Sequence, residues 1–153
     1  MAHVYFYQTD IGTLVIAENG QGITDIYFGD QAPDSRNTVV ETPMIKIAYE
    51  QLREYFAGTR KQFDFPLDLQ GTEFQKKVWK ALMEIPYGHT YSYGQIAAAI
   101  GQPKASRAVG MANNRNPVCI AVPCHRVIGS NGKLVGYAEG LHIKEYLLQL
   151  EKE

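Results

Sequence analysis

Short apolar runs separated by glycine-containing breaks make up the first thirty residues of the chain. The runs are rich in β-branched and aromatic residues and cover Val4–Tyr7, Thr13–Ala17 and Ile23–Phe28. Gly12 separates the first two runs, and a break containing Gly20 separates the next two. Runs of this length, bounded by turn residues, are typical of β-strands joined by tight turns. We therefore predict a small antiparallel meander.

A helical pattern follows the predicted strands and stops at Gly58. Its apolar residues recur at the spacing of one helix face, and they are Ile45, Ala48, Leu52, Tyr55 and Phe56. The next run, Phe63–Leu67, is interpreted as an edge strand or a linker, because Pro66 cannot donate a hydrogen bond to a neighbouring strand. We place a domain boundary near Gly71, which divides the chain into residues 1–70 and residues 71–153.

The second part is predicted to be mostly helical. Two capping boxes, Thr72–Gln75 and Ser92–Gln95, each open a helix, and the first is followed by an apolar stripe that ends at Pro86. The second helix runs to Ile100. A third is predicted from Lys104 to about Asn113, and a fourth over Gly140–Glu151.

The second and third of these helices are joined by the short break Gly101–Pro103. A helix, a short turn containing glycine and a second helix form the helix-turn-helix arrangement, whose second helix commonly enters a DNA groove. Because many helical proteins contain such a pair, this pattern alone favours DNA binding only weakly.

Composition narrows the class of protein. Hydrophobic residues make up 45% of the chain and charged residues 20%, which is typical of a globular protein. No apolar run approaches the roughly 20 residues that cross a bilayer, and residues 1–10 lack a signal-peptide pattern. The two cysteines, Cys119 and Cys124, fit reduced thiols in the cytoplasm better than a disulfide framework.

Charge is distributed unevenly along the chain. Residues 1–70 carry five Lys/Arg against ten Asp/Glu, whereas residues 71–153 carry ten against six. No acid occurs between Ile85 and Ala138, and the basic residues in that stretch are Lys104, Arg107, Arg115, Arg126 and Lys133. A surface facing a polyanion needs such a stretch, because carboxylates there would repel phosphate. Chance clustering in loops is the alternative.

The third predicted helix consists mostly of small side chains around one long cation, Arg107. Small residues let a helix backbone approach whatever lies opposite, which suits insertion into a DNA groove with the guanidinium filling the space of an extruded base. Close packing against another helix is the competing interpretation.

A cysteine and a histidine stand side by side at Cys124 and His125, just after Pro123. A cysteine pKa near 8.5 is lowered toward a reactive thiolate by neighbouring cations or imidazole. Adjacent residues of a strand point to opposite faces, so His125 could assist Cys124 only from a turn or through a bridging water. Pro123 makes a turn plausible. A buried, inert thiol is the alternative, and the histidines and cysteines show no zinc-type spacing.

The run Pro123–Val127 resembles the active-site signature of the O6-alkylguanine-DNA alkyltransferases, the methylated-DNA–protein-cysteine methyltransferases. The resemblance covers residues 71–153, in the order Gly71-Thr72, Phe74-Gln75, Val78-Trp79, Ile85-Pro86, Gly88, Ser92-Tyr93, Arg107–Gly110, Asn116-Pro117 and Gly140-Leu141. It is much weaker over residues 1–70. The resemblance implies an α+β fold, with a small ribonuclease-H-like α/β N-terminal domain and a helical C-terminal domain containing a winged-helix-like helix-turn-helix.

The resemblance also implies site residues. Cys124 would be the alkyl acceptor, and His125 would contact it through a water and be oriented by a glutamate of the last helix, matched by Glu145. Tyr93 matches the tyrosine that donates a proton toward guanine, and Asn116 matches the asparagine that braces the turn. Arg107 matches the arginine that replaces the flipped nucleotide. Its helix lies in the minor groove in this family, so the expected DNA contacts also include Lys104, Ala105, Ser106, Gly110 and Arg115.

The expected substrate pocket differs from that of some relatives at two positions. It comprises the backbone of Cys124 and Val127 together with Tyr137, Ala138, Glu139 and Cys119. Some members have glycine in place of Glu139, and some have proline in place of Cys119. Both positions bear on which alkyl groups fit.

The implied activity is direct reversal repair of double-stranded DNA. Each protein molecule would transfer one alkyl group to Cys124, either from O6-alkylguanine or from O4-alkylthymine. The resemblance also implies that the protein acts as a monomer in the cytoplasm and needs no metal or cofactor. A cysteine hydrolase using Cys124 and His125 is one rival interpretation, although it leaves the Arg107 helix unexplained. A protein that binds lesions without repairing them, or regulates transcription, is another.

Overall fold

The computed structural model describes residues 2–129, 131–132 and 137–152. The chain divides into two compact units, residues 1–70 and residues 71–153. In the part of the chain that the structure describes, no helix is long and apolar enough to cross a membrane.

The N-terminal unit is built on a four-stranded sheet in the order β3-β2-β1-β4. Strands β1 (His3–Thr9), β2 (Gly12–Glu18) and β3 (Ile23–Phe28) pair antiparallel, which confirms the predicted meander. Strand β4 (Thr38–Val39) pairs parallel with β1 and was not predicted, because two residues carry too little pattern.

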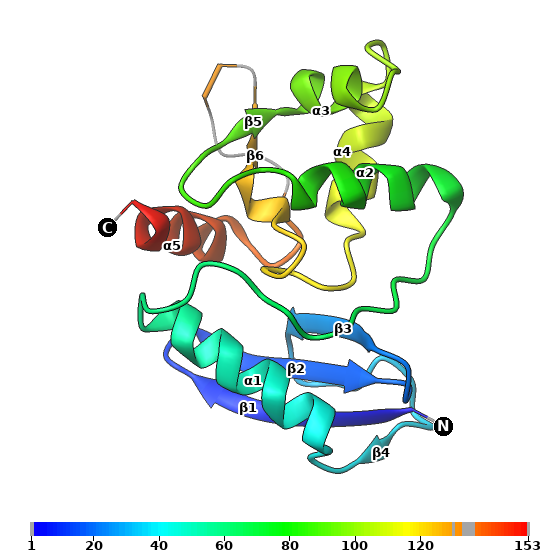
Figure 1. Cartoon of the computed structure of the whole chain (residues 1–153), viewed down its shortest axis with the longest axis vertical. Helices are drawn as coiled ribbons and strands as arrows, with labels where there is room; N and C mark the ends of the chain where they lie inside the picture. Colours follow the sequence, from blue (N-terminus) through cyan, green and yellow to red (C-terminus); the bar gives the residue numbers. More distant parts are fainter. Residues whose placement is uncertain (1, 130, 133–136, 153) are drawn as a thin grey trace. The chain divides into compact units, whose positions relative to one another are not determined.

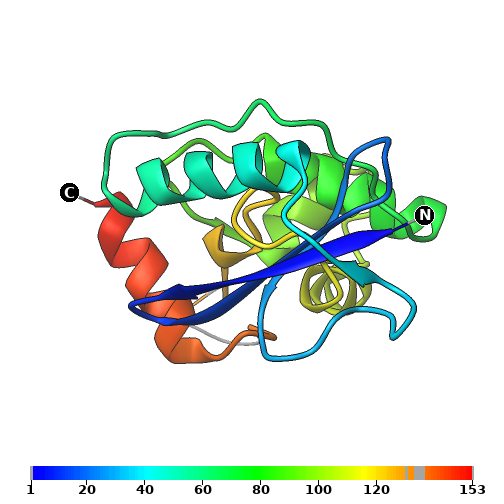
Figure 2. The ribbon, with the colours of Figure 1, turned by 90° about the horizontal axis from the view of Figure 1, so that it is seen from below.

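The helix predicted next is α1 (Pro43–Phe56), whose N-terminus is capped by Thr42. It lies along one face of the sheet (Figures 1 and 2). Four of the five residues of the predicted stripe, Ile45, Ala48, Leu52 and Tyr55, are buried, and the fifth, Phe56, is partly buried. Residues 63–67 form no continuous strand, and only Leu67 pairs, in an isolated parallel β-bridge with Ile23. They touch the sheet through Ile23, whose N–H donates to the Pro66 carbonyl over 2.8 Å.

Among its described residues, the C-terminal unit has four α-helices as its framework: α2 (Glu73–Met83), α3 (Tyr93–Ala99), α4 (Ser106–Asn114) and α5 (Leu141–Glu151). Both predicted capping boxes are formed, one by Thr72 with Gln75 and the other by Ser92 with Gln95. The indole of Trp79 ties α2 to α4 by donating to the Ala112 carbonyl over 2.8 Å. Gly71 is required beside it, because a Cβ there would lie 2.6 Å from the Trp79 ring.

Two short parallel strands join distant parts of this unit. Strand β5 (Tyr91–Ser92) immediately precedes α3, and β6 (Val127–Ile128) immediately follows a 3-10 turn at Cys124–Arg126. Tyr91 pairs with Val127, and Ser92 pairs with Ile128. This pairing was not predicted from the sequence. It connects the start of α3, where Tyr93 lies, to the segment that carries Cys124 and His125.

Candidate active site

The segment before Cys124 is held in a tight loop by Asn116. The Asn116 amide donates to the Val122 carbonyl over 2.7 Å, and its oxygen accepts from the Val118 N–H over 3.0 Å. Within the loop, Ile120 has a φ of 72°, an uncommon conformation for a β-branched residue. The loop ends at Pro123, after which the chain enters a 3-10 turn. The turn predicted at Pro123 is confirmed, and it removes the constraint that a strand would have placed on adjacent side chains.

Cys124 lies deep in this arrangement, with only 4% of its surface exposed. Burial raises the pKa of its thiol to about 11, and nearby Glu139 adds to the rise, while Asn116, Tyr137 and Lys144 oppose it. The sequence led us to expect the opposite direction, because it indicated cationic neighbours but not the degree of burial. The resting residue is therefore a protonated thiol, and the reaction must remove its proton.

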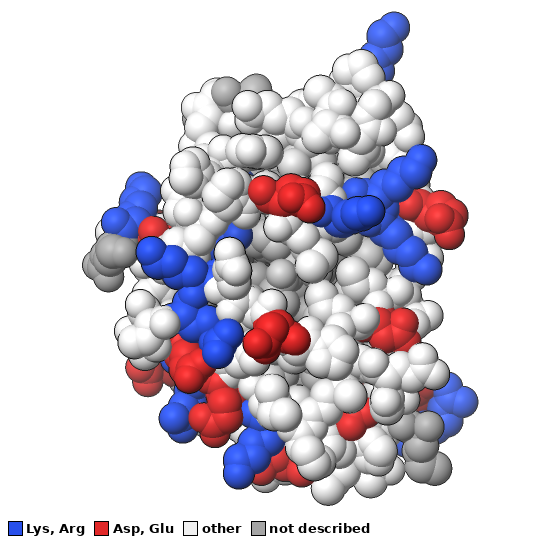
Figure 3. Space-filling view, viewed as in Figure 1, with Lys and Arg blue, Asp and Glu red and all other residues white. Residues whose placement is uncertain are grey.

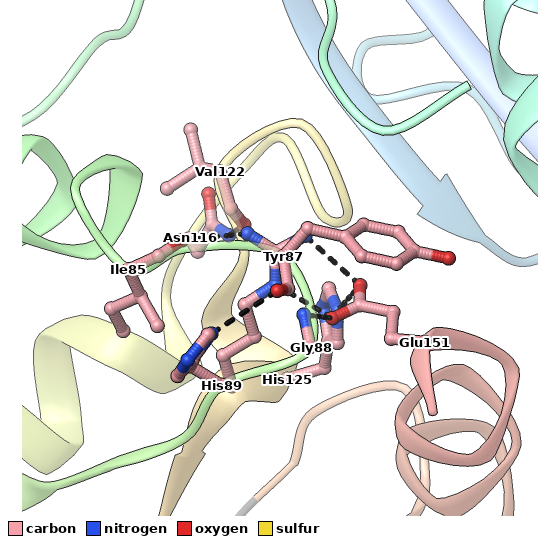
Figure 4. A network of polar contacts seen from close by, with 9 residues as sticks. Ile85, Tyr87, Gly88, His89, Asn116, Val122, His125 and Glu151 are labelled. Carbon is pink, nitrogen blue, oxygen red and sulfur yellow. Dashed lines mark hydrogen bonds and ion pairs between the residues drawn. The ribbon is translucent and has the colours of Figure 1, made fainter. Parts of the chain in front are cut away.

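His125 is fully buried, and its Nε2 lies 2.6 Å from Glu151 Oε2 (Figure 4). Glu151 extends from the last turn of α5 toward His125 and Gly88, and the Gly88 N–H donates to Glu151 Oε1 over 3.2 Å. Burial lowers the pKa of His125, Glu151 raises it, and Arg126 and Lys144 lower it. The imidazole is thus held in place by a carboxylate while its cationic form is disfavoured.

The prediction that Glu145 orients His125 is wrong, and Glu151 occupies that position. Glu145 is exposed, whereas the buried positions of α5 are Ile143, Lys144, Leu147 and Glu151. Spacings of three and four residues place these four on one helix face. The spacing from Leu147 to Glu151 could have identified the correct glutamate, because Glu145 lies on the opposite face.

Lys144 is a second residue that the sequence reasoning missed. It is fully buried, and its ammonium donates to the Val127 carbonyl over 2.5 Å and lies 5.9 Å from the centre of the Tyr137 ring. Burial lowers the pKa of Lys144 to about 8, and Cys124 partly opposes that shift. A buried cation beside a thiol stabilises the thiolate whenever the proton leaves.

Tyr93 lies at the first residue of α3 and is partly buried. Burial raises the pKa of its hydroxyl, and Cys124 contributes to the rise, so the phenol is protonated at neutral pH. Gly110 of α4 packs against it, because a Cβ built on Gly110 would lie 3.7 Å from the Tyr93 ring. The structure thus brings Tyr93, the middle of α4 and Cys124 into one neighbourhood.

The helix-turn-helix pair presents an exposed basic face. Lys104, Ser106, Arg107 and Arg115 are exposed, and Ala105 is partly buried at the start of α4. The large apolar side chain of Met111 is also 61% exposed, one turn after Arg107. On the face seen in Figure 3, the region around α3 and the α3–α4 turn shows no acidic atoms, and a basic side chain projects at the turn.

Not every basic residue of the acid-free stretch lies on this face. Arg126 is buried and bonded to Glu151, so the expectation that it contributes to a polyanion-facing surface is wrong. The sequence around Arg126 does not indicate that its partner is the buried carboxylate of Glu151, 25 residues further along the chain. Lys133 lies outside the described residues.

Of the residues expected to form the substrate pocket, Tyr137, Glu139 and Cys119 lie near enough to the Cys124 thiol to interact with it. Cys119 and Tyr137 are buried, Glu139 is partly buried, and Ala138 is exposed. Burial raises the pKa of Cys119, and the charge of Glu139 adds to this rise, as it does at Cys124. Glu139 is therefore close enough for its charge to act on both thiols. Among the described residues, no three His, Cys, Asp or Glu side chains gather as metal ligands would.

Two family models together cover almost the whole chain. The ribonuclease-like domain of 6-O-methylguanine DNA methyltransferase matches residues 3–69, and the DNA-binding domain of the same protein matches residues 73–153. The methylated-DNA–protein-cysteine methyltransferase of Methanosarcina acetivorans is 54% identical over 150 residues, which are 95% of this chain and 95% of that protein.

Solved structures agree with this assignment. The crystal structure of Mycobacterium tuberculosis O6-methylguanine methyltransferase superposes with a TM-score of 0.92 at 47% identity, covering 99% of this chain and 93% of that one. The crystal structure of M. tuberculosis OGT in complex with DNA superposes with a TM-score of 0.91 at 49% identity, covering 98% and 92%. The chain belongs to the 6-O-methylguanine DNA methyltransferase family.

Proposed function

We propose that the protein repairs DNA by moving the alkyl group of O6-alkylguanine onto the sulfur of Cys124, once per molecule. The observation that carries this proposal is the buried Cys124, with the His125–Glu151 pair and Lys144 around it and Tyr93 close by. The methyltransferase relatives and the DNA complex of the M. tuberculosis protein support it.

The chemistry balances without an added cofactor. His125 takes the proton of the Cys124 thiol, and the sulfur attacks the alkyl carbon in line with the bond to O6. The S–C bond forms as the C–O6 bond breaks, and the electron pair of the broken bond stays on guanine. Tyr93 donates a proton to the departing guanine, and the proton held by His125 returns through solvent to Tyr93. The thioether that remains on Cys124 is stable, so the protein is consumed.

Delivery of the base to a buried thiol requires extrusion from the duplex. The exposed face of α4 suits the minor groove, because the exposed residues on either side of Arg107, Ser106 and Ala108, are small and let the helix backbone approach DNA closely. Arg107 would fill the space that the extruded nucleotide vacates, and Lys104 and Arg115 would contact phosphates. Asn116 holds the loop. Backbone groups of Cys124 and Val127 would contact the edge of the extruded guanine.

The proposed substrate is double-stranded DNA carrying O6-alkylguanine, with O4-alkylthymine as a second substrate. The reaction as written uses side chains of one chain, so the proposed acting species is a monomer, and its proposed compartment is the cytoplasm. The pocket wall near Cys119 and Glu139 would set the size of alkyl group that is accepted.

Mass spectrometry after incubation with an O6-methylguanine duplex tests the proposal. We expect one added methyl group, located on Cys124, and repair that stops at one lesion per molecule. Cys119→Ala removes the other thiol and should still acquire one methyl group on Cys124, whereas Cys124→Ala should bind the duplex without acquiring methyl. Methyl on Cys119, or several turnovers per molecule, would contradict the proposal. DNA binding without any adduct would favour a lesion-binding protein, and turnover through an acyl intermediate would favour a hydrolase.

A further inference from the structure

Glu151 is shared between two cationic or potentially cationic partners. Its Oε2 lies 2.6 Å from His125 Nε2 and 3.0 Å from an Arg126 Nη2, while its Oε1 accepts from Arg126 Nε over 2.8 Å. The side chain of Glu151 is only 1% exposed. Arg126 therefore donates hydrogen bonds to both oxygens of the carboxylate that orients His125.

Arg126 is itself fixed on its remaining sides. Its Nη1 donates to the Ile85 carbonyl over 2.8 Å, and its guanidinium lies 5.6 Å from the centre of the Tyr87 ring. The loop that follows α2 thus holds the guanidinium in a single position, near Gly88, whose N–H also donates to Glu151. An arginine guanidinium is a planar cation, and these contacts hold it rigidly against the Glu151 carboxylate.

The protonation of His125 follows from this geometry. A buried carboxylate without a cation would take up a proton or draw one onto its neighbour. With Arg126 on both oxygens, Glu151 stays ionised and can only accept hydrogen bonds, so His125 Nε2 must carry the hydrogen between them. A neutral imidazole with hydrogen on Nε2 has its lone pair on Nδ1.

We propose that Arg126 is a positioning residue for the alkyl-transfer reaction, which keeps Glu151 ionised and His125 neutral so that Nδ1 can accept the thiol proton. This inference rests on the proposed function in one respect, which is that Cys124 is the group that gives its proton to His125. The charged groups that act on His125 are Glu151 and Lys144 from α5 and Arg126 beside it. Without Arg126, His125 would be the remaining side chain that can neutralise the Glu151 carboxylate. We would then expect His125 to take up a proton and form an imidazolium–carboxylate pair with Glu151.

A purely structural role makes a different prediction. If Arg126 only ties α5 to the loop after α2, neutral substitutions would reduce stability and activity without changing the protonation of His125. The two roles are therefore separated by a titration rather than by a loss of activity.

Nitrogen NMR of histidine-labelled protein in the absence of DNA provides that titration. In the wild type, we expect His125 to be neutral, with hydrogen on Nε2, at and below the ordinary histidine pKa of about 6.5. The resonances of the His125 ring nitrogens are identified as those missing from the spectrum of the His125→Gln variant. An imidazolium at that pH, or hydrogen on Nδ1 of the neutral ring, would overturn the proposal without any variant and whether or not the protein transfers alkyl groups.

Variants then separate charge from packing. In Arg126→Met, the pKa of His125 should rise by about one unit or more, and the acid side of the pH–rate profile for methyl transfer should move upward with it. Arg126→Gln is the second neutral variant if Arg126→Met does not fold. Arg126→Lys, which keeps the charge, should retain the low pKa. A lowered melting temperature with an unchanged His125 titration in the neutral variants, or an equal shift in Arg126→Lys, would overturn the proposal.

Discussion

Glu151 and His125, 26 positions apart in the sequence, meet over 2.6 Å in the interior of the C-terminal unit. The contact joins the last turn of α5 to the 3-10 turn that carries Cys124. Glu145, on the same helix, is exposed and points elsewhere. This difference between two glutamates of one helix provides a direct test of the proposed proton transfer.

Glu151→Gln should slow methyl transfer by up to about 10²- to 10⁴-fold, the usual worth of a general base, because the proposed base His125 loses the carboxylate that orients it. The exposed Glu145 provides the matched control, and Glu145→Gln should react at the wild-type rate. Single-turnover kinetics with O6-methylguanine duplex measure both. Because Glu151→Gln also leaves the buried Arg126 without its anion, rates are compared below the melting temperature of each variant. Equal rates for the two variants would exclude Glu151 from the reaction.

The raised pKa of the Cys124 thiol predicts how its reactivity depends on pH. With a pKa of about 11, the thiolate is a small fraction at neutral pH and grows as the pH rises. Alkylation of Cys124 by a small reagent should therefore accelerate from about pH 6.5 to 9.5, by close to tenfold per unit at first. Site-resolved mass spectrometry measures the rate. A rate that is flat over this range would mean that the resting residue is already a thiolate.

Lys144→Met removes the buried cation beside that thiol, so the pKa of Cys124 should rise further and alkylation should slow. The difference from the wild type should be largest below about pH 8, where Lys144 is charged, and should shrink above it as Lys144 loses its proton. The control is Lys152→Met, which removes an exposed charge just after α5. A loss of rate that is the same at all pH values would point to altered packing instead.

Arg107→Ala should slow repair of duplex DNA far more than reaction with a free O6-alkylguanine base. Unstacking a base costs a few kcal/mol, and only the duplex reaction requires it. Arg115→Ala, at the other end of α4, should instead reduce the salt dependence of DNA binding, because it would remove a phosphate contact. Parallel kinetics on duplex and free base measure the first effect, and binding at several salt concentrations measures the second. Equal slowing on both substrates would show that Arg107 serves the fold or the chemistry.

The pocket should favour small alkyl groups. Cys119 gives a less rigid wall than proline, and the partly buried Glu139 places charge near the thiol where some relatives have glycine. We expect slow reaction with O6-benzylguanine relative to O6-methylguanine in DNA. Cys119→Pro combined with Glu139→Gly should improve the benzyl reaction selectively, by about 1–3 kcal/mol of transition-state binding. Inactivation rates with the free benzylated base measure this, and an unchanged rate would mean that these positions do not set the pocket.

Local features of the fold follow from the sequence because their interactions span only a few residues. The capping boxes at Thr72 and Ser92 satisfy N–H groups three residues away, and the apolar stripe of α1 reflects the pitch of one helix. The meander of β1 to β3 is local in the same sense, since each strand pairs with the next across a tight turn. Such patterns persist however the rest of the chain packs.

Cys124 and His125 could likewise be proposed as site residues from the sequence, because the signature that contains them is continuous in the chain. The partners of these residues could not. Glu151 and Glu145 lie on different faces of α5, and only the face that carries Glu151 is buried. Arg126 was expected at the surface, because the sequence does not show that it pairs with Glu151 in the interior. The parallel pairing of Tyr91 with Val127 joins segments that have no pattern in common. These contacts, and the burial that raises the pKa of Cys124, depend on how helices rotate and pack against one another, which only the tertiary structure decides.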